Sequence, residues 1–125
     1  MLASKNAIAT IAVKDTKAAK EFYEGKLGLK PERTEEPGVL AYKSGGSTLF
    51  VYESRYAGTN KATAATWVVD DVEGEVKSLR DKGVSFEHYD MPETTRKGDV
   101  HVSGKTMAAW FKDPDGNILA VSQRL

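Results

Sequence analysis

The sequence lacks cysteine, and this absence excludes several kinds of chemistry. None of the 125 residues can form a disulfide, hold zinc through a thiolate or act as a cysteine nucleophile. The chain also lacks an excess of either charge, because 18 Lys and Arg residues balance 18 Asp and Glu residues. A balanced chain has no overall field that attracts nucleic acid or an anionic membrane, so we expect neither as a partner.

Long hydrophobic runs are missing as well. The apolar stretch at residues 7–13 is followed at once by Lys14 and Asp15, so it is far shorter than the roughly 20 residues that span a bilayer. It also lacks the arrangement of a secretory signal. We therefore expect a cytoplasmic protein, whose length suits one compact domain over residues 1–125.

In the first half, the hydrophobic pattern predicts a strand, a helix and then three further strands. Asp15 is the expected N-cap of the helix, and Gly28 is its expected end. The strands are expected at residues 7–13, in the edge segment 31–37, at 39–43 and at 48–52. A polar linker follows at about residues 55–62.

The second half repeats this order. A strand is expected at residues 64–69, followed by a helix that Asp70 caps, with Glu73 completing a capping box, and that ends at Gly83. Further strands are expected at 84–89, 107–111 and 117–123, separated by a polar loop at 90–105 and a turn at 113–116. The sequence of that turn, Asp-Pro-Asp-Gly, is explained by turn chemistry rather than by a cation site.

Individual residues repeat along with the pattern. The motif GLKPE at residues 28–32 matches GVSFE at 83–87 with an offset of 55, and GSTLFV at 46–51 matches GNILAV at 116–121 with an offset of 70. The 15 additional residues fall in the loop at 90–105. We therefore predict an α+β fold of two tandem βαβββ modules, at about residues 6–54 and 63–123, which form half-barrel sheets with a helix packed on the outer face of each.

Three segments carry a family resemblance. They are EFYEGKLGLKPE at residues 21–32, VVDDVEGEVKSLRDKGVSFE at 68–87 and WFKDPDGNILAV at 110–121. Together they resemble the vicinal-oxygen-chelate superfamily over nearly the whole chain. That superfamily includes glyoxalase I, extradiol dioxygenases and metal-free resistance proteins of the bleomycin-resistance type. The resemblance implies a small-molecule ligand, and we expect a homodimer.

In the metal-dependent members of that superfamily, His, Gln or Glu side chains on the first and last strands of each half hold the metal. The resemblance places those positions at Ile8, Phe50, Ala64 and Ala120. None of these side chains can donate a lone pair, so we predict no metal ligand and no cofactor. The favoured hypothesis is a metal-free protein that binds an aromatic or antibiotic-like small molecule. Two alternatives stay open: a divalent-metal-dependent lyase or dioxygenase of the glyoxalase I/extradiol dioxygenase class, and a metal-independent enzyme that uses Tyr52, His88 or Glu87.

Strand alternation extends this prediction to neighbouring side chains, because every second residue faces the same side of a sheet. Such a surface suits an organic ligand, and the alternative is that the same side chains only fill a core. Trp110 and Phe111 are adjacent, so one of them must face the helix and the other the cavity. The expected cavity lining is Ile8, Thr10, Phe50, Tyr52, Thr66, Trp110 and Ala120.

Polar candidates lie at the end of a predicted strand. Glu87, His88 and Tyr89 could contact a ligand or act as acid–base groups, and the alternative is an exposed strand end of mixed charge. His101 lies in the polar loop, where we expect it to be solvated, and the loop itself is a candidate lid. Trp67 has the opposite parity to the cavity residues and is expected to pack under the second helix.

Overall fold

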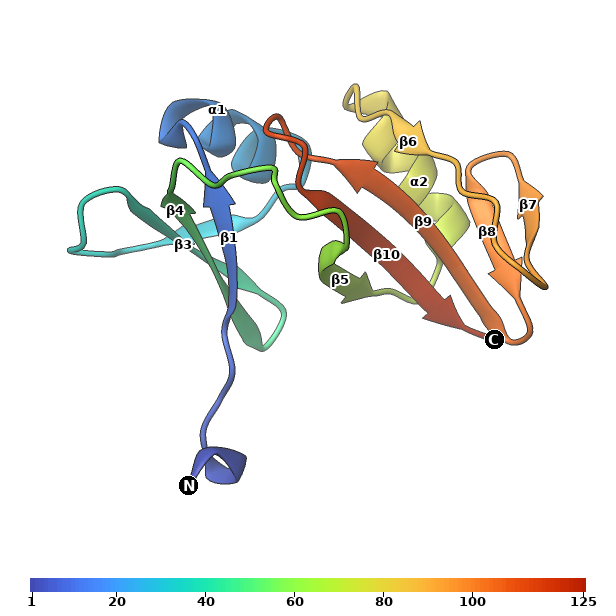
Figure 1. Cartoon of the computed structure of the whole chain (residues 1–125), viewed down its shortest axis with the longest axis horizontal. Helices are drawn as coiled ribbons and strands as arrows, with labels where there is room; N and C mark the ends of the chain where they lie inside the picture. Colours follow the sequence, from blue (N-terminus) through green and yellow to red (C-terminus); the bar gives the residue numbers. More distant parts are fainter.

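The computed structural model describes residues 1–125 and contains two β-sheets that lie side by side (Figure 1). The first sheet has the order β1-β4-β3-β2, in which β1 (Ala9–Val13) runs parallel to β4 (Ser47–Glu53). β3 (Val39–Ser44) and β2 (Lys30–Glu32) continue the sheet with antiparallel pairing. A short 3-10 helix, η1 (Leu2–Ser4), lies at the N-terminus, and the segment before β1 projects away from the body (Figure 1).

The second sheet has the order β5-β10-β9-β8-β7, and the short strand β6 (Phe86–Glu87) also pairs with β9. β5 (Thr63–Val68) runs parallel to β10 (Ile118–Arg124), as β1 does to β4. β9 (Thr106–Lys112), β8 (Val100–Ser103) and β7 (Thr95–Lys97) follow with antiparallel pairing. The two sheets confirm the predicted α+β fold of two βαβββ modules.

Each module has one helical segment between its first two strands. In the first module, α1 (Thr16–Lys20) continues as the π-helical turn η2 (Glu21–Lys26), and the Asp15 carboxylate caps it by accepting a hydrogen bond from the Lys17 amide at 2.9 Å. Gly28 follows with a φ of 73°, a left-handed conformation that suits glycine, so the chain leaves the helix where the sequence predicted.

In the second module, α2 (Val72–Asp81) begins one residue later than predicted. Its N-cap is Asp71, whose carboxylate accepts from the Gly74 amide at 3.1 Å, so the assignment of Asp70 as the cap was wrong. The sequence offers two adjacent aspartates, and only the backbone conformation distinguishes them: Asp71 is extended and directly precedes the first helical residue.

The predicted polar loop at 90–105 is also partly wrong, because it contains the whole of β7 and β8. Glu87 of β6 pairs with Trp110, and His101 of β8 pairs with Ala108, so both strands occupy the same edge of β9. His101 follows Glu87 by fourteen residues in the chain, but their partners on β9, Ala108 and Trp110, are only two residues apart. Residues 88–99 are an insertion of twelve residues into one interrupted strand, and they account for most of the 15 additional residues of the second half.

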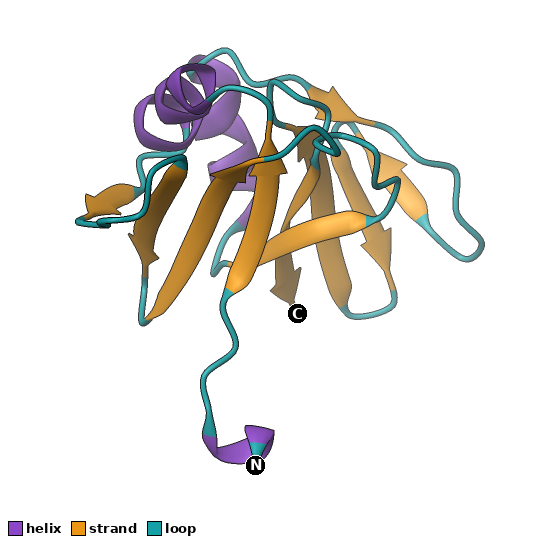
Figure 2. Cartoon of the chain, turned by 60° about the vertical axis from the view of Figure 1, so that its left-hand side comes forward, coloured by secondary structure: helices purple, strands orange, loops and turns teal.

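Apart from the N-terminal turn η1, the helices α1, η2 and α2 gather on one side of the strands, and the opposite faces of the sheets carry no helix (Figure 2). The hydrophobic core lies on the helix side and includes Ile11 and Val13 from β1 and Val72 and Val76 from α2. Trp67 packs against this core and stacks on Phe111, with ring centroids 6.5 Å apart. Trp67 therefore lies on the core side of the second sheet, as its parity predicted.

A buried carboxylate in the turn between β9 and β10 joins the two modules. Asp113 is 5% exposed and accepts hydrogen bonds from the Asp115 and Asn117 amides at 3.0 and 2.9 Å, which confirms the turn chemistry read from the sequence. Its other oxygen accepts from the Tyr23 hydroxyl at 2.8 Å and from the Asn117 side chain at 2.7 Å. Since Tyr23 belongs to η2, the turn also anchors the helix of the first module.

Two further hydrogen bonds extend this junction to the first strand. The Asn117 side-chain amide donates to the Ala12 carbonyl at 2.7 Å, and the Asp115 carboxylate accepts from the Lys14 amide at 3.0 Å. Burial raises the pKa of the Tyr23 hydroxyl, and the charge of Asp113 raises it further, so the phenol stays protonated and donates.

None of the helices has both the length and the apolar composition that a membrane crossing requires.

Candidate functional site

The helix-free face of the first sheet carries three of the predicted cavity residues. Phe50 and Tyr52 on β4 lie beside Thr10 on β1, because Thr10 pairs with Phe50 in the sheet. These three side chains line a cavity of about 370 Å³ together with Thr34, Glu36 and Val39. Ile8 lies just before β1, is 42% exposed and lines no part of this cavity.

The helix-free face of the second sheet carries the other predicted residues. Thr66 and Ala120 pair directly in the sheet, and Trp110 pairs with Ala120 from the other side. All three line a cavity of about 420 Å³, which we call the Trp110 groove. The remaining lining residues are Thr63, Met91, Pro92, Thr94, His101, Ser103, Thr106, Ala108 and Ser122.

Trp110 is the largest side chain of this groove. It is half-buried, and its indole N–H donates to the Thr63 hydroxyl at 3.1 Å, which fixes the ring orientation. Phe111 is 1% exposed and packs in the core, so it is the residue of the pair that faces the helix. A second space of about 500 Å³ continues from the groove past Trp110 and Met91 to Tyr89 and Lys61.

The two helix-free faces do not meet in a common cavity. The cavity beside Phe50 is lined only by residues of the first module, and the Trp110 groove is lined only by residues of the second. Within one chain, each module therefore presents its own half of a binding surface.

The residues at the four metal positions of the superfamily do not fit a metal ion. Ile8, Phe50, Ala64 and Ala120 offer only hydrocarbon, and nowhere do three or more His, Asp or Glu side chains gather closely enough to hold an ion. The nearest polar neighbour of Ala120 across the parallel pairing is Thr66, whose neutral hydroxyl is a weak ligand compared with imidazole or carboxylate. No metal-dependent step can be built on this donor set.

His101 is the site residue that the sequence misplaced. It is 2% exposed, lies on β8 and lines the Trp110 groove, so the expectation of a solvated side chain was wrong. Its ring lies edge-on to that of Trp110, with centroids 4.9 Å apart. The alternation of Val100, His101 and Val102 is typical of a strand and could have indicated that His101 is buried. The strand is short and is surrounded by polar residues and glycines, so the segment was predicted to be a loop.

The three polar candidates of the predicted strand end have separate environments. Tyr89 lies edge-on to Trp110, with centroids 5.5 Å apart, and lines the continuation of the groove. Glu87 forms an ion pair with Lys112 at 3.3 Å, and His88 contacts Asp99 at 2.7 Å. Only Tyr89 is therefore brought to the groove. Burial raises its pKa, and the Glu87 carboxylate raises it further.

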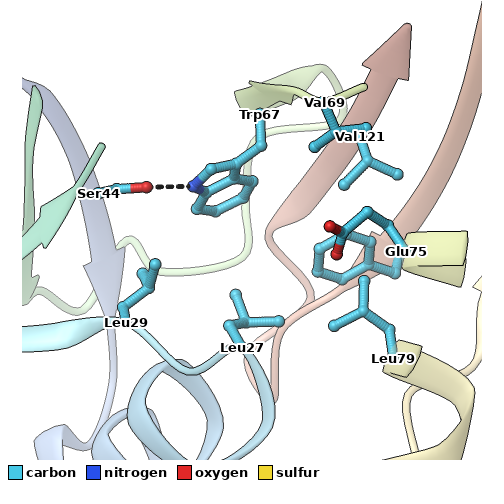
Figure 3. A pocket seen from close by; sticks show the side chains of 9 residues that line it. Leu27, Leu29, Ser44, Trp67, Val69, Glu75, Leu79 and Val121 are labelled. Carbon is cyan, nitrogen blue, oxygen red and sulfur yellow. Dashed lines mark hydrogen bonds between the residues drawn. The ribbon is translucent and has the colours of Figure 1, made fainter. Parts of the chain in front are cut away.

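A third, smaller cavity lies between the modules on the helix side (Figure 3). It has a volume of about 230 Å³ and a mainly apolar lining that includes Leu27, Leu29 and Leu79. The Trp67 indole N–H donates to the Ser44 hydroxyl at 2.9 Å and so links the two modules across it (Figure 3). We assign this cavity to packing between the modules, because it offers less room than the helix-free faces.

Comparisons with known proteins agree with this architecture. No curated protein matches the sequence. Among solved structures, a putative glyoxalase family protein from Bacillus anthracis is 14% identical, with a TM-score of 0.70 over 94% of this chain and 93% of that one. The lactoylglutathione lyase from Agrobacterium tumefaciens is 17% identical, with a TM-score of 0.69 over 96% and 93%. TnmS3, an antibiotic-binding protein from Streptomyces sp. CB03234, is 19% identical, with a TM-score of 0.66 over 98% of each chain.

These likenesses show a shared fold. The model of one protein family matches residues 6–121, which is nearly the whole chain. The chain belongs to the Glyoxalase/Bleomycin resistance protein/Dioxygenase superfamily.

Proposed function

We propose that this protein is a metal-free binding protein for planar aromatic small molecules, which lie against the indole of Trp110. The observation that carries the proposal is the composition of the helix-free faces. They offer an oriented indole, a phenyl ring and several hydroxyl groups where metal-dependent relatives need charged or imidazole ligands. Aromatic side chains bind planar ligands by stacking, and a few hydroxyls are enough to orient them.

The proposal includes a homodimer. One chain carries two half-surfaces that share no lining residue, so a closed site needs a second surface opposite each of them. A symmetric dimer supplies this, because it pairs the face of Phe50 in one chain with the Trp110 groove of its partner. The exposed apolar side chains Ile8, Tyr52 and Val68, which are 42%, 37% and 82% exposed, are available for burial in such an arrangement.

A fluorescence titration tests the binding proposal. The chain has two tryptophans, so the Trp67→Phe variant leaves Trp110 as its only indole fluorophore. Flavone, acridine and naphthalene derivatives are then titrated into this protein, and quenching that saturates is the expected result. The Trp110→Leu variant should bind at least about tenfold more weakly, because it loses the stacking surface. A panel that produces neither quenching nor a thermal shift would contradict the proposal.

A mixing experiment tests the shared site. The Phe50→Ser and Trp110→Leu chains each bind poorly alone if both faces contribute to every site. Mixed dimers regain one intact site, so random mixing should restore about a quarter of the sites. No restoration, in a protein that sediments as a monomer, would show that each chain binds by itself.

The alternative is a divalent-metal-dependent lyase or dioxygenase, the class suggested by the fold of the lactoylglutathione lyase. The apolar residues at the four metal positions oppose it. Elemental analysis of protein purified without chelator distinguishes the two functions. One tightly held divalent ion per site would favour the enzyme, whereas metal that stays substoichiometric after incubation with Zn, Ni, Mn or Fe salts would favour the binding protein.

A further inference from the structure

The loop that begins the insertion lies over one end of the Trp110 groove. Met91, Pro92 and Thr94 line the groove, and Tyr89, Asp90 and Met91 line its continuation. Glu93, in the same loop, has a φ of 57° and is the one non-glycine residue of the chain with a positive φ. This left-handed conformation is unfavourable for a residue with a β-carbon, so the loop is held in a strained state.

The base of this loop is fixed by an unusual hydrogen bond. The Tyr89 backbone N–H donates to Nε2 of His101 at 3.0 Å. Nε2 must therefore be unprotonated and accept, which leaves the proton of the neutral ring on Nδ1. The Nδ1–H group is consequently a donor and cannot be an acceptor.

Two polar atoms at this point have no hydrogen-bond partner in the protein. Nδ1 of His101 and the hydroxyl oxygen of Tyr89 are both out of contact with solvent, and neither is bonded. The two tyrosines with fully buried rings differ in this respect, because the Tyr23 hydroxyl donates to Asp113 and the Tyr42 hydroxyl donates to Glu24, each at 2.8 Å. Buried polar groups without partners are uncommon in native proteins and call for a functional explanation.

We propose that the Tyr89 hydroxyl and the Nδ1–H group of His101 are the polar anchor of the ligand site, and that they recognise a carbonyl or phenolate oxygen on a planar ligand stacked against Trp110. The inference rests on the proposed function and adds the chemical class of the ligand. Both rings lie edge-on to Trp110, at centroid distances of 5.5 and 4.9 Å, so a ligand beside the indole is also close to the two side chains that carry these donors. The ligand must supply an acceptor, because Nδ1–H can only donate.

Access to the anchor requires the loop to move. Because both atoms are shielded from solvent, a ligand oxygen reaches them only when residues 90–94, beyond the fixed base of the loop, shift away from the groove. The left-handed conformation of Glu93 and the two unpaired polar groups both raise the free energy of the closed state, which favours this shift. The ligand then provides the missing hydrogen bonds.

A stability measurement tests the anchor without any ligand. Tyr89→Phe removes a buried hydroxyl that has no partner, so we expect the melting temperature to rise by about 2–6 °C. Tyr42→Phe is the matched control, because it removes a hydroxyl that has a partner, and its melting temperature should fall. A fall for Tyr89→Phe of the size found for Tyr42→Phe would show that the Tyr89 hydroxyl is satisfied, and it would overturn the proposal.

A matched ligand pair tests recognition. Fluorenone-2-carboxylate and fluorene-2-carboxylate have nearly the same shape and charge and differ by one carbonyl oxygen. The protein should prefer the ketone by about tenfold, and Tyr89→Phe should lose most of this preference while its affinity for the fluorene stays within about twofold. Tyr56→Phe is the control, since this exposed side chain lies outside the groove, and it should keep the preference.

The outcomes separate the anchor from the proposed function. Equal binding of the two compounds by the unaltered protein would overturn the anchor and leave aromatic binding in place. A preference for the ketone that Tyr89→Phe retains would overturn the role of the tyrosine. If neither compound binds, aromatic binding in the groove fails, and the anchor fails with it.

Discussion

Replacing Tyr23 by phenylalanine tests the junction that joins the two modules. The Tyr23 hydroxyl is buried and donates to the Asp113 carboxylate at 2.8 Å. The substitution keeps the aromatic ring, which stacks on Tyr42 and meets Phe22 edge-on, so it removes the hydrogen bond with little loss of packing. The carboxylate keeps its bonds from the Asn117 side chain and from two backbone amides.

The expected cost follows from the type of bond. A hydrogen bond to a charged acceptor contributes about 1.5–3 kcal/mol, so Tyr23→Phe should lower the free energy of unfolding by about that amount. Asp113→Ala should cost more, about 3–5 kcal/mol, because it leaves the Tyr23 hydroxyl buried without an acceptor and removes the bonds that form the turn. The two substitutions share one bond, so their effects should not add.

Urea unfolding, followed by tryptophan fluorescence at one protein concentration, measures both variants and the double variant. Tyr23→Phe should be neutral or stabilising when Asp113 is already alanine, because the phenol then has no acceptor to lose. The coupling free energy between the two sites should therefore be about 1.5–3 kcal/mol. If Tyr23→Phe costs the same in both backgrounds, the bond contributes nothing to stability, and our account of the junction is wrong.

Two further predictions concern alkaline pH and the insertion. Burial raises the pKa of Tyr23 and Tyr42 above the ordinary value of about 10, so the stability they contribute is complete below pH 10 and is lost as the pH rises towards their folded pKa values. Unfolding titrations should show stability falling above pH 10, less steeply in Tyr23→Phe, and a flat profile would contradict this. Deleting residues 88–99 joins Glu87 to Val100 and should leave a folded protein by circular dichroism, with binding of aromatic ligands reduced at least about tenfold; loss of folding would show that the insertion belongs to the structural core.

Much of the fold could be predicted because the two modules repeat the same order of strands and helix in the sequence. The repeated glycine motifs mark corresponding turns in the two modules. Gly28 is an example, since its left-handed φ ends the first helix, a conformation that favours glycine. The choice between Asp70 and Asp71 could not be made in the same way. Both residues can cap a helix, and the difference lies in a backbone conformation that the packing of α2 determines.

The candidate site was predicted less completely, for a physical reason. Strand alternation placed Thr66 and Ala120 on one face and required either Trp110 or Phe111 to join them, because all these residues belong to long strands with regular spacing. His101 belongs to a strand of four residues whose identity depends on pairing with β9. The local sequence of so short a segment does not indicate which strand it pairs with, because that pairing is determined by tertiary structure.

The insertion also explains how a binding loop was added without disturbing the sheet. Glu87 and His101 pair with Trp110 and Ala108, which leaves one position of β9, Ala109, between them. Val100 precedes His101 and is 4% exposed, with its side chain in the core, as the alternation of the interrupted strand requires. The chain therefore resumes the strand in the correct register after its excursion, and His101 faces the groove rather than the core. The sheet keeps its hydrophobic side intact, and residues 88–94 remain available for the ligand contacts that we propose.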